Sequence, residues 1–215
     1  DIRFEEENTA TEVSGSVMQF PHLVLGAVAL FCYVGVEVIA GDTIGLYGSS
    51  LGVANATSLT SFTMTAMVVG YLLGLVCIPR VISQAAALKA SAGLGLVLTV
   101  AILLGSDDST LLSSLLCGWL GLPVVPDTIA MIALLGLANA MVWPTIWPLA
   151  LAGLGKFTPQ GSAILIMGIA GGAILPLAYG GLADVLSSQL AYAIMIPCYL
   201  FIGYYATLGH KKASW

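Results

Sequence analysis

The residue whose type and position best suit chemistry is Glu37, a carboxylate within the long apolar segment of residues 21–47. A charged side chain at the centre of a bilayer costs about 2.5 kcal/mol or more on insertion scales, so such residues face a wet cavity or a polar partner. Tyr33 and Gly41 lie four residues before and after Glu37, on the same face of a helix. A ring and a small residue beside a carboxylate would suit a sugar hydroxyl. The alternative is that Glu37 pairs with a neighbouring helix.

Asp42 is the other acidic residue of this segment, five positions after Glu37. Five residues rotate a helix by about 140°, because each residue contributes about 100°. The two carboxylates therefore do not share a face and do not form the acid and base pair of a glycosidase. We expect Asp42 near the outer end of the segment, where solvation is easy.

Asn139 and Trp143 form a second candidate pair, because they lie four residues apart on one face of the segment 128–154. An Asn amide both donates to and accepts from hydroxyls, and an indole ring packs on the apolar face of a sugar. Pro144 and Pro148 follow, and each removes a backbone donor and can kink the helix. The alternative is that Asn139 joins helices and Trp143 packs in the core.

The sequence lacks the motifs of common catalytic and cofactor sites: it has no P-loop, H-E-x-x-H or G-x-S-x-G pattern. Its four cysteines include no C-x-x-C pair, which predicts neither a metal site nor a disulfide framework. Six lysines and arginines are too few for a nucleic-acid surface. We therefore expect no enzyme, no cofactor or metal, and no nucleic-acid partner.

The elements that position these residues must lie in lipid. Hydrophobic residues make up 59% of the 215 residues and charged residues only 8%, whereas soluble domains carry about 25% charged residues. Several apolar stretches approach or exceed the roughly 20 residues that cross a bilayer as a helix. Each span must satisfy its own backbone polar groups, which predicts an all-α polytopic bundle of six transmembrane helices. The expected spans are residues 21–47, 58–78, 85–104, 128–154, 162–182 and 190–208.

Charge decides the number of spans. The apolar stretch 111–125 has 15 residues, too few to cross comfortably, and suits an interfacial helix. With six spans, every Lys and Arg falls on one side and the loop aspartates on the other, the positive-inside pattern with both termini cytoplasmic. The expected organisation is then a cytoplasmic linker (1–19), a transmembrane domain (20–209) and a cytoplasmic tail (210–215).

Two stretches carry a family resemblance. One is YVGVEV, residues 33–38. The other is residues 136–184, GLANAMVWPTIWPLALAGLGKFTPQGSAILIMGIAGGAILPLAYGGLAD. Both resemble the C-terminal half of the fucose–galactose–glucose proton symporters, a branch of the major facilitator superfamily.

The resemblance implies that the six spans are the seventh to twelfth helices of a twelve-helix sugar transporter in a bacterial inner membrane. In that fold the seventh and tenth helices line the central cavity, which places Glu37 and Asn139 on cavity-lining helices. The missing N-terminal half would be a partner, together with a hexose or deoxyhexose substrate and protons. The proton-coupling carboxylates of the family are generally assigned to that half. Because the chain begins with Asp rather than Met, we expect it to be part of something longer.

Other functions remain open at this point. The chain could be a self-contained six-helix protein that dimerises to form a transporter or channel. An intramembrane enzyme using Glu37 and Asp42 is disfavoured by their 140° offset, which follows from about 100° per residue. A purely structural subunit would leave a mid-span Glu with no cation in the spans to pair it.

Overall fold

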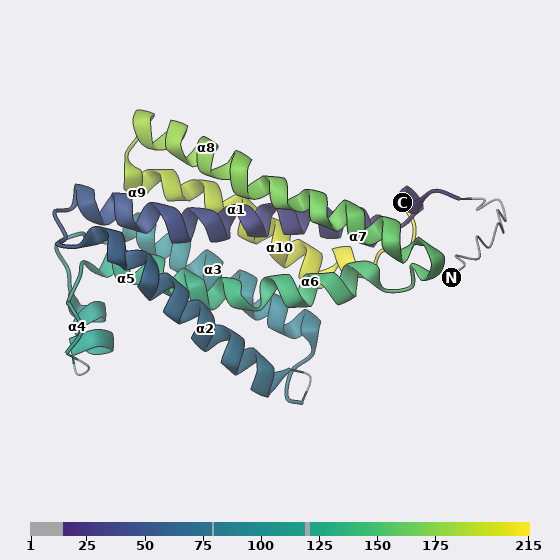
Figure 1. Ribbon diagram of the computed structural model, residues 1–215, viewed down its shortest axis with the longest axis horizontal. Coiled ribbons are helices and arrows are strands. Elements are labelled where there is room, and N and C mark those ends of the chain that lie inside the picture. The colour runs from purple at the N-terminus through teal and green to yellow at the C-terminus, as the bar shows by residue number, and fades with distance from the viewer. Residues whose placement is uncertain (1–14, 79, 119–120) are drawn as a thin grey trace, which may run out of the picture.

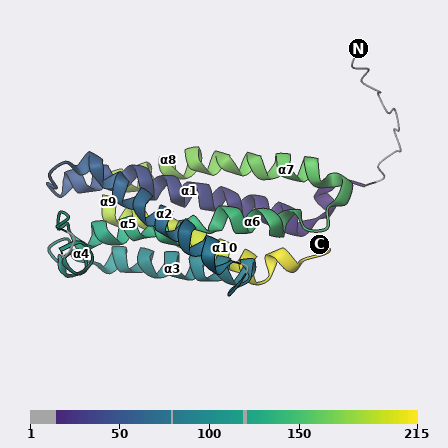
Figure 2. The ribbon, with the colours of Figure 1, turned by 60° about the horizontal axis from the view of Figure 1, so that its bottom comes forward.

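The computed structural model describes residues 15–78, 80–118 and 121–215, so most of the expected linker 1–19 lies outside the described residues. Within them, six helical spans are long and apolar enough to cross a membrane, which confirms the predicted number. The described residues form helices and connections without a β-strand. Figures 1 and 2 show a bundle in which α1 begins and α10 ends at the same end.

The first three spans are each built on one continuous α-helix. The one-turn 3₁₀ helix η2 (Ala56–Ser58) leads directly into the second of them. The bounds of the three are α1 (Pro21–Ser50), α2 (Leu59–Cys77) and α3 (Gln84–Leu104). The first has 30 residues and is therefore about 45 Å long, at about 1.5 Å per residue. It is longer than the hydrocarbon core is thick, which leaves room for polar residues near its ends.

The fourth span is divided into α5 (Asp127–Ala140) and α6 (Val142–Leu151). Pro144 has no backbone N–H to donate to the carbonyl of Ala140, four residues earlier, and its ring crowds that carbonyl. The α-helix is interrupted at Met141 for this reason. This interruption is where the prolines predict a kink.

The last two spans are also composite. The fifth joins η4 (Gly155–Phe157), α7 (Thr158–Met167), η5 (Gly168–Ala170) and α8 (Gly171–Val185). The sixth joins α9 (Ser188–Ala191), η6 (Tyr192–Ile194), α10 (Met195–Thr207) and η7 (Gly209–Lys211). The expected spans 162–182 and 190–208 lie inside these bounds.

The apolar stretch after the third span contains the short helix α4 (Leu111–Cys117), which lies at the end of the bundle opposite the termini (Figure 1). Seven residues rise only about 10 Å, so α4 does not cross the bundle. The Asp127 carboxylate holds the connection, accepting from the Ser109 hydroxyl at 2.5 Å and the Ser113 backbone N–H at 3.1 Å. Asp107 accepts from the Tyr47 hydroxyl at 2.6 Å.

The opposite end of the bundle carries the basic residues. There the ring nitrogens of His22 lie 2.9 Å and 3.3 Å from the carbonyl oxygens of Ala152 and Lys212. This places the start of α1, the connection after α6 and the C-terminal tail side by side. The cations that the structure describes lie in or beside the segments of this end: Arg80, Lys89, Lys156, Lys211 and Lys212.

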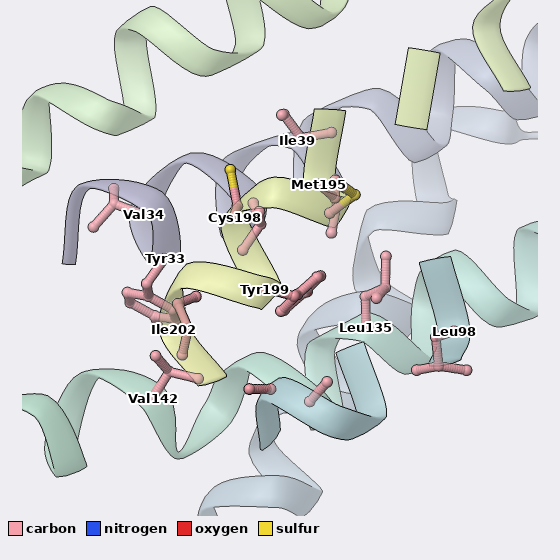
Figure 3. Close-up of a cluster of buried hydrophobic side chains, with 14 of the residues drawn as sticks. Tyr33, Val34, Ile39, Leu98, Leu135, Val142, Met195, Cys198, Tyr199 and Ile202 are labelled. Carbon is pink, nitrogen blue, oxygen red and sulfur yellow. The ribbon is translucent and has the colours of Figure 1, made fainter. Parts of the chain in front are cut away.

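The first and fourth spans form the centre of the bundle. In the most apolar 18-residue stretch of each span, 50% of the residues are buried in the first span and 61% in the fourth. The corresponding shares are 28% in the second span and 22% in the fifth. Figure 3 shows the core between them, where α1 meets α10 and the fourth span, with Tyr33, Val142, Tyr199 and Ile202 among the buried side chains. Residues that could do chemistry in the first and fourth spans are therefore positioned by dense packing on several sides.

Candidate functional site

Tyr33 and Glu37 lie one turn apart on α1 and differ in accessibility. The Tyr33 side chain is 1% exposed and lies within the core (Figure 3), whereas Glu37 is half-buried. The two side chains are neighbours, and no cation lies beside the carboxylate among the described residues. Asp42, farther along α1, is exposed. Glu37 is therefore a mid-span carboxylate whose neighbours are hydroxyl groups rather than a salt-bridge partner.

The structure adds Tyr71 of α2 to this group. Its side chain is 40% exposed and lies next to both Tyr33 and Glu37. Sequence reasoning missed it, because a single tyrosine in an apolar helix has no periodic partner on its own element. The available signal was weak: Tyr71 is the only hydroxyl between residues 66 and 77.

Asn139 lies deeper than its predicted role requires. The side chain is 0% exposed, and its Oδ1 accepts a hydrogen bond from the Tyr199 hydroxyl at 2.8 Å. Its Nδ2 has no hydrogen-bond partner among the described residues. Gly95 of α3 makes room for this pair, because a Cβ there would overlap the Tyr199 ring. Tyr199 in turn lies near Glu37.

Trp143 is half-buried at the start of α6 and belongs to a row of aromatic rings. Its ring centroid lies 6.2 Å from that of Tyr33 and 5.7 Å from that of Trp147. The Trp147 Nε1 is buried and has no hydrogen-bond partner in the described part of the chain. Asn139, Trp143 and Trp147 follow one another at intervals of four residues. The row runs from the Glu37 region toward the end that carries the termini.

A cavity of about 300 Å³ lies between α2 and α6, beside Tyr71. The cavity is lined by the polar residues Tyr71, Gln84 and Thr145. Apolar side chains complete the lining: Leu75, Ile78, Met141 and Pro144. The Thr145 hydroxyl donates to the Met141 carbonyl at 2.5 Å, so toward a ligand it can act only as an acceptor. Tyr71 thus lines this cavity and is also a neighbour of the Glu37 carboxylate.

The structure gathers Tyr33, Glu37 and Trp143 on one side of the bundle centre, and places Asn139 behind them. The group combines an acceptor carboxylate, a phenol that can both donate and accept, and an indole face. Such a set binds a polyhydroxylated ligand: the carboxylate accepts from hydroxyls and the rings pack on C–H surfaces. No group here is arranged as a nucleophile with a base.

Comparison with known proteins finds relatives of one kind. Over 219 residues the chain is 36% identical to the glucose/galactose transporter of Brucella abortus, an alignment that covers 99% of this chain and 48% of that protein. Over 220 residues it is 30% identical to the putative glucose/galactose transporter of Helicobacter pylori, covering 97% of this chain and 48% of that protein. The chain thus spans about half the length of these relatives. No family model and no solved structure matches it.

Proposed function

The chain belongs to the major-facilitator sugar transporters and corresponds to their C-terminal half, and from this premise we propose that it takes part in secondary active transport of a monosaccharide, a hexose or deoxyhexose. In this proposal it forms one wall of a central site, and a six-helix N-terminal half forms the other. The observation that carries the proposal is Glu37, half-buried at mid-span beside Tyr33 and Tyr71 rather than beside a cation.

The four predicted residues have different parts in the proposed site. Glu37 and Trp143 are half-buried, so they contact the sugar directly through the carboxylate and the indole face. Tyr33 and Asn139 are almost fully buried and position these two side chains. The Nδ2 of Asn139 has no hydrogen-bond partner among the described residues, and a water molecule would satisfy this donor.

Coupling and orientation complete the proposal. We propose that protons drive transport and that the N-terminal half supplies the coupling carboxylates. The described cations gather at the end that carries both termini, which supports cytoplasmic termini in a bacterial inner membrane.

Transport measurements test the role of Glu37. The full-length transporter that carries this chain as its C-terminal half is reconstituted in vesicles, and uptake of labelled glucose and galactose is measured. In Glu37→Gln the apparent KM for uptake should rise about 10- to 100-fold, because a hydrogen bond to a charged group contributes about 1.5–3 kcal/mol. Asp42→Asn is the matched control on the same helix and should transport normally.

The same assay tests the other parts of the proposal. Asn139→Ala should lower uptake, and a protonophore should abolish accumulation against a gradient. Normal uptake and affinity in both Glu37→Gln and Asn139→Ala would remove their assigned role. Accumulation that survives the protonophore would exclude proton coupling.

A further inference from the structure

The second span presents a largely apolar exposed surface with one hydroxyl in it. Around Tyr71, the side chains of Val68, Leu72 and Leu75 are 56%, 60% and 77% exposed. A phenol at mid-span in such a surface needs a polar neighbour or water, because lipid offers no hydrogen-bond partner. The neighbours that the structure supplies are the Tyr33 hydroxyl and the Glu37 carboxylate.

Glycines on both sides of Tyr71 fix its position. A Cβ on Gly70 would meet the Ala140 side chain and the Leu137 backbone carbonyl, and a Cβ on Gly74 would overlap the Met141 side chain. These two contacts press α2 against the junction of α5 and α6, where the aromatic row begins. Close packing at these two glycines therefore fixes where the Tyr71 backbone lies relative to α5 and α6.

Tyr71 also borders the open volume between α2 and α6, of about 300 Å³. Tyr33 and Tyr199 are each 1% exposed and Trp143 is half-buried, whereas Tyr71 is 40% exposed. Tyr71 is therefore a neighbour of Glu37 that also lines this volume.

We propose that Tyr71 is a substrate-contacting residue that makes the site specific for one hydroxyl of the sugar. This inference rests on the proposed function and adds a third membrane span, the second in the chain, to its site. A carboxylate only accepts hydrogen bonds, whereas a phenol both donates and accepts. One sugar hydroxyl donates to Glu37, and the adjacent hydroxyl pairs with Tyr71. A sugar that lacks this adjacent hydroxyl gains nothing from Tyr71.

Equilibrium binding of the full-length transporter to a hexose and to its monodeoxy analogues tests the inference. Tyr71→Phe keeps the ring and removes only the hydroxyl. It should raise the Kd for the parent hexose about tenfold, the upper range for one hydrogen bond. For one monodeoxy analogue, the wild type and the variant should bind equally, since the missing hydroxyl is the one that Tyr71 contacts.

Tyr204→Phe is the matched control, a half-buried tyrosine of α10 whose ring packs on Phe201 at 5.8 Å. It should leave every Kd unchanged.

The inference is overturned if Tyr71→Phe binds all sugars as the wild type does. It is also overturned if Tyr71→Phe raises the Kd of every sugar by one common factor, which would indicate a structural role. If the wild-type transporter nevertheless binds hexose and Glu37→Gln binds it more weakly, the proposed function still holds. If the wild type binds no hexose, both are overturned.

Discussion

At the scale of single residues, the hydrogen bond between Tyr199 and Asn139 links α10 to α5 inside the core. The two side chains are 1% and 0% exposed, so neither can exchange this bond for water in the folded protein. Because the Asn139 Nδ2 already lacks a described partner, the Tyr199 hydroxyl is what satisfies the remaining polar atom of that side chain. The pair therefore couples stability to a residue proposed to position the substrate.

Removing the Tyr199 hydroxyl should destabilise the protein. In Tyr199→Phe the Oδ1 of Asn139 loses its partner, and we expect a loss of about 1–2 kcal/mol in the free energy of unfolding. Asn139→Leu combined with Tyr199→Phe should recover most of this loss, since replacing both partners with apolar groups is close to neutral. Thermal unfolding of the detergent-purified protein measures both. An unchanged Tm in the single variant would contradict the assigned hydrogen bond.

Which residues are neighbours could be predicted from the sequence only where both lie on one helix. The shared face of Tyr33 and Glu37 follows from four-residue spacing. In contrast, Tyr199 lies 60 residues from Asn139 along the chain, and Tyr71 belongs to a different span from Glu37. Such partners depend on which helices pack together, and hydropathy carries no information about that.

At the scale of helices, glycines determine how closely α8 approaches α1. A Cβ on Gly171 would overlap the Phe31 carbonyl, and a Cβ on Gly168 would lie 3.0 Å from the Ala27 carbonyl oxygen. Backbone thus packs directly on backbone along this interface, as small residues permit between membrane helices. The fifth span is anchored to the bundle here, although most of its surface is exposed.

A methyl group at this contact should separate the helices. We expect Gly171→Ala to lower the stability by about 1–3 kcal/mol, the usual effect of overpacking a tight interface. Gly180→Ala on the same helix meets open space and should stabilise by about 0.5–1 kcal/mol, because Ala is the better helix former. Thermal unfolding of the two variants should therefore shift in opposite directions. Equal shifts would rule out the close contact of α8 with α1.

Helix ends were harder to predict than helix positions. The fourth span was expected to reach residue 154 but ends at Leu151, and Gly153 and Gly155 beyond it adopt left-handed φ values of +73° and +53°. The fifth starts several residues before the expected residue 162, because Pro159 lies in the first turn of α7, where a proline is well tolerated. Local backbone geometry therefore explains why both helix ends differ from the expected ones.

At the scale of the whole molecule, charge distinguishes the two ends of the bundle. Asp107 and Asp127, at the end opposite the termini, are held by hydroxyl and backbone donors rather than by cations. The positive-inside rule then predicts cytoplasmic termini. Six spans, the absence of a seventh span at the short helix α4 within the described residues, and this asymmetry could all be predicted from composition, span length and charge, since the bilayer imposes them on any sequence.

Cysteine labelling in intact cells tests this orientation. The four native cysteines are first replaced, and Ser106→Cys or Ala213→Cys is then introduced at an exposed position of either end. A membrane-impermeant maleimide should label Ser106→Cys in intact cells, and Ala213→Cys only after permeabilisation. The reverse pattern would invert the proposed orientation, and labelling of both from outside would contradict the six-span topology.

Because the chain has an even number of membrane spans, its two ends lie on the same side of the membrane. Duplication and in-frame fusion of a gene for such a unit would therefore yield two copies inserted in the same direction. The copies would be related by rotation about the membrane normal, as in parallel repeats, and not inverted. A unit with five or seven spans would instead alternate its direction at each duplication. Whether the number of spans is even or odd thus determines which symmetric assemblies can evolve from the bundle.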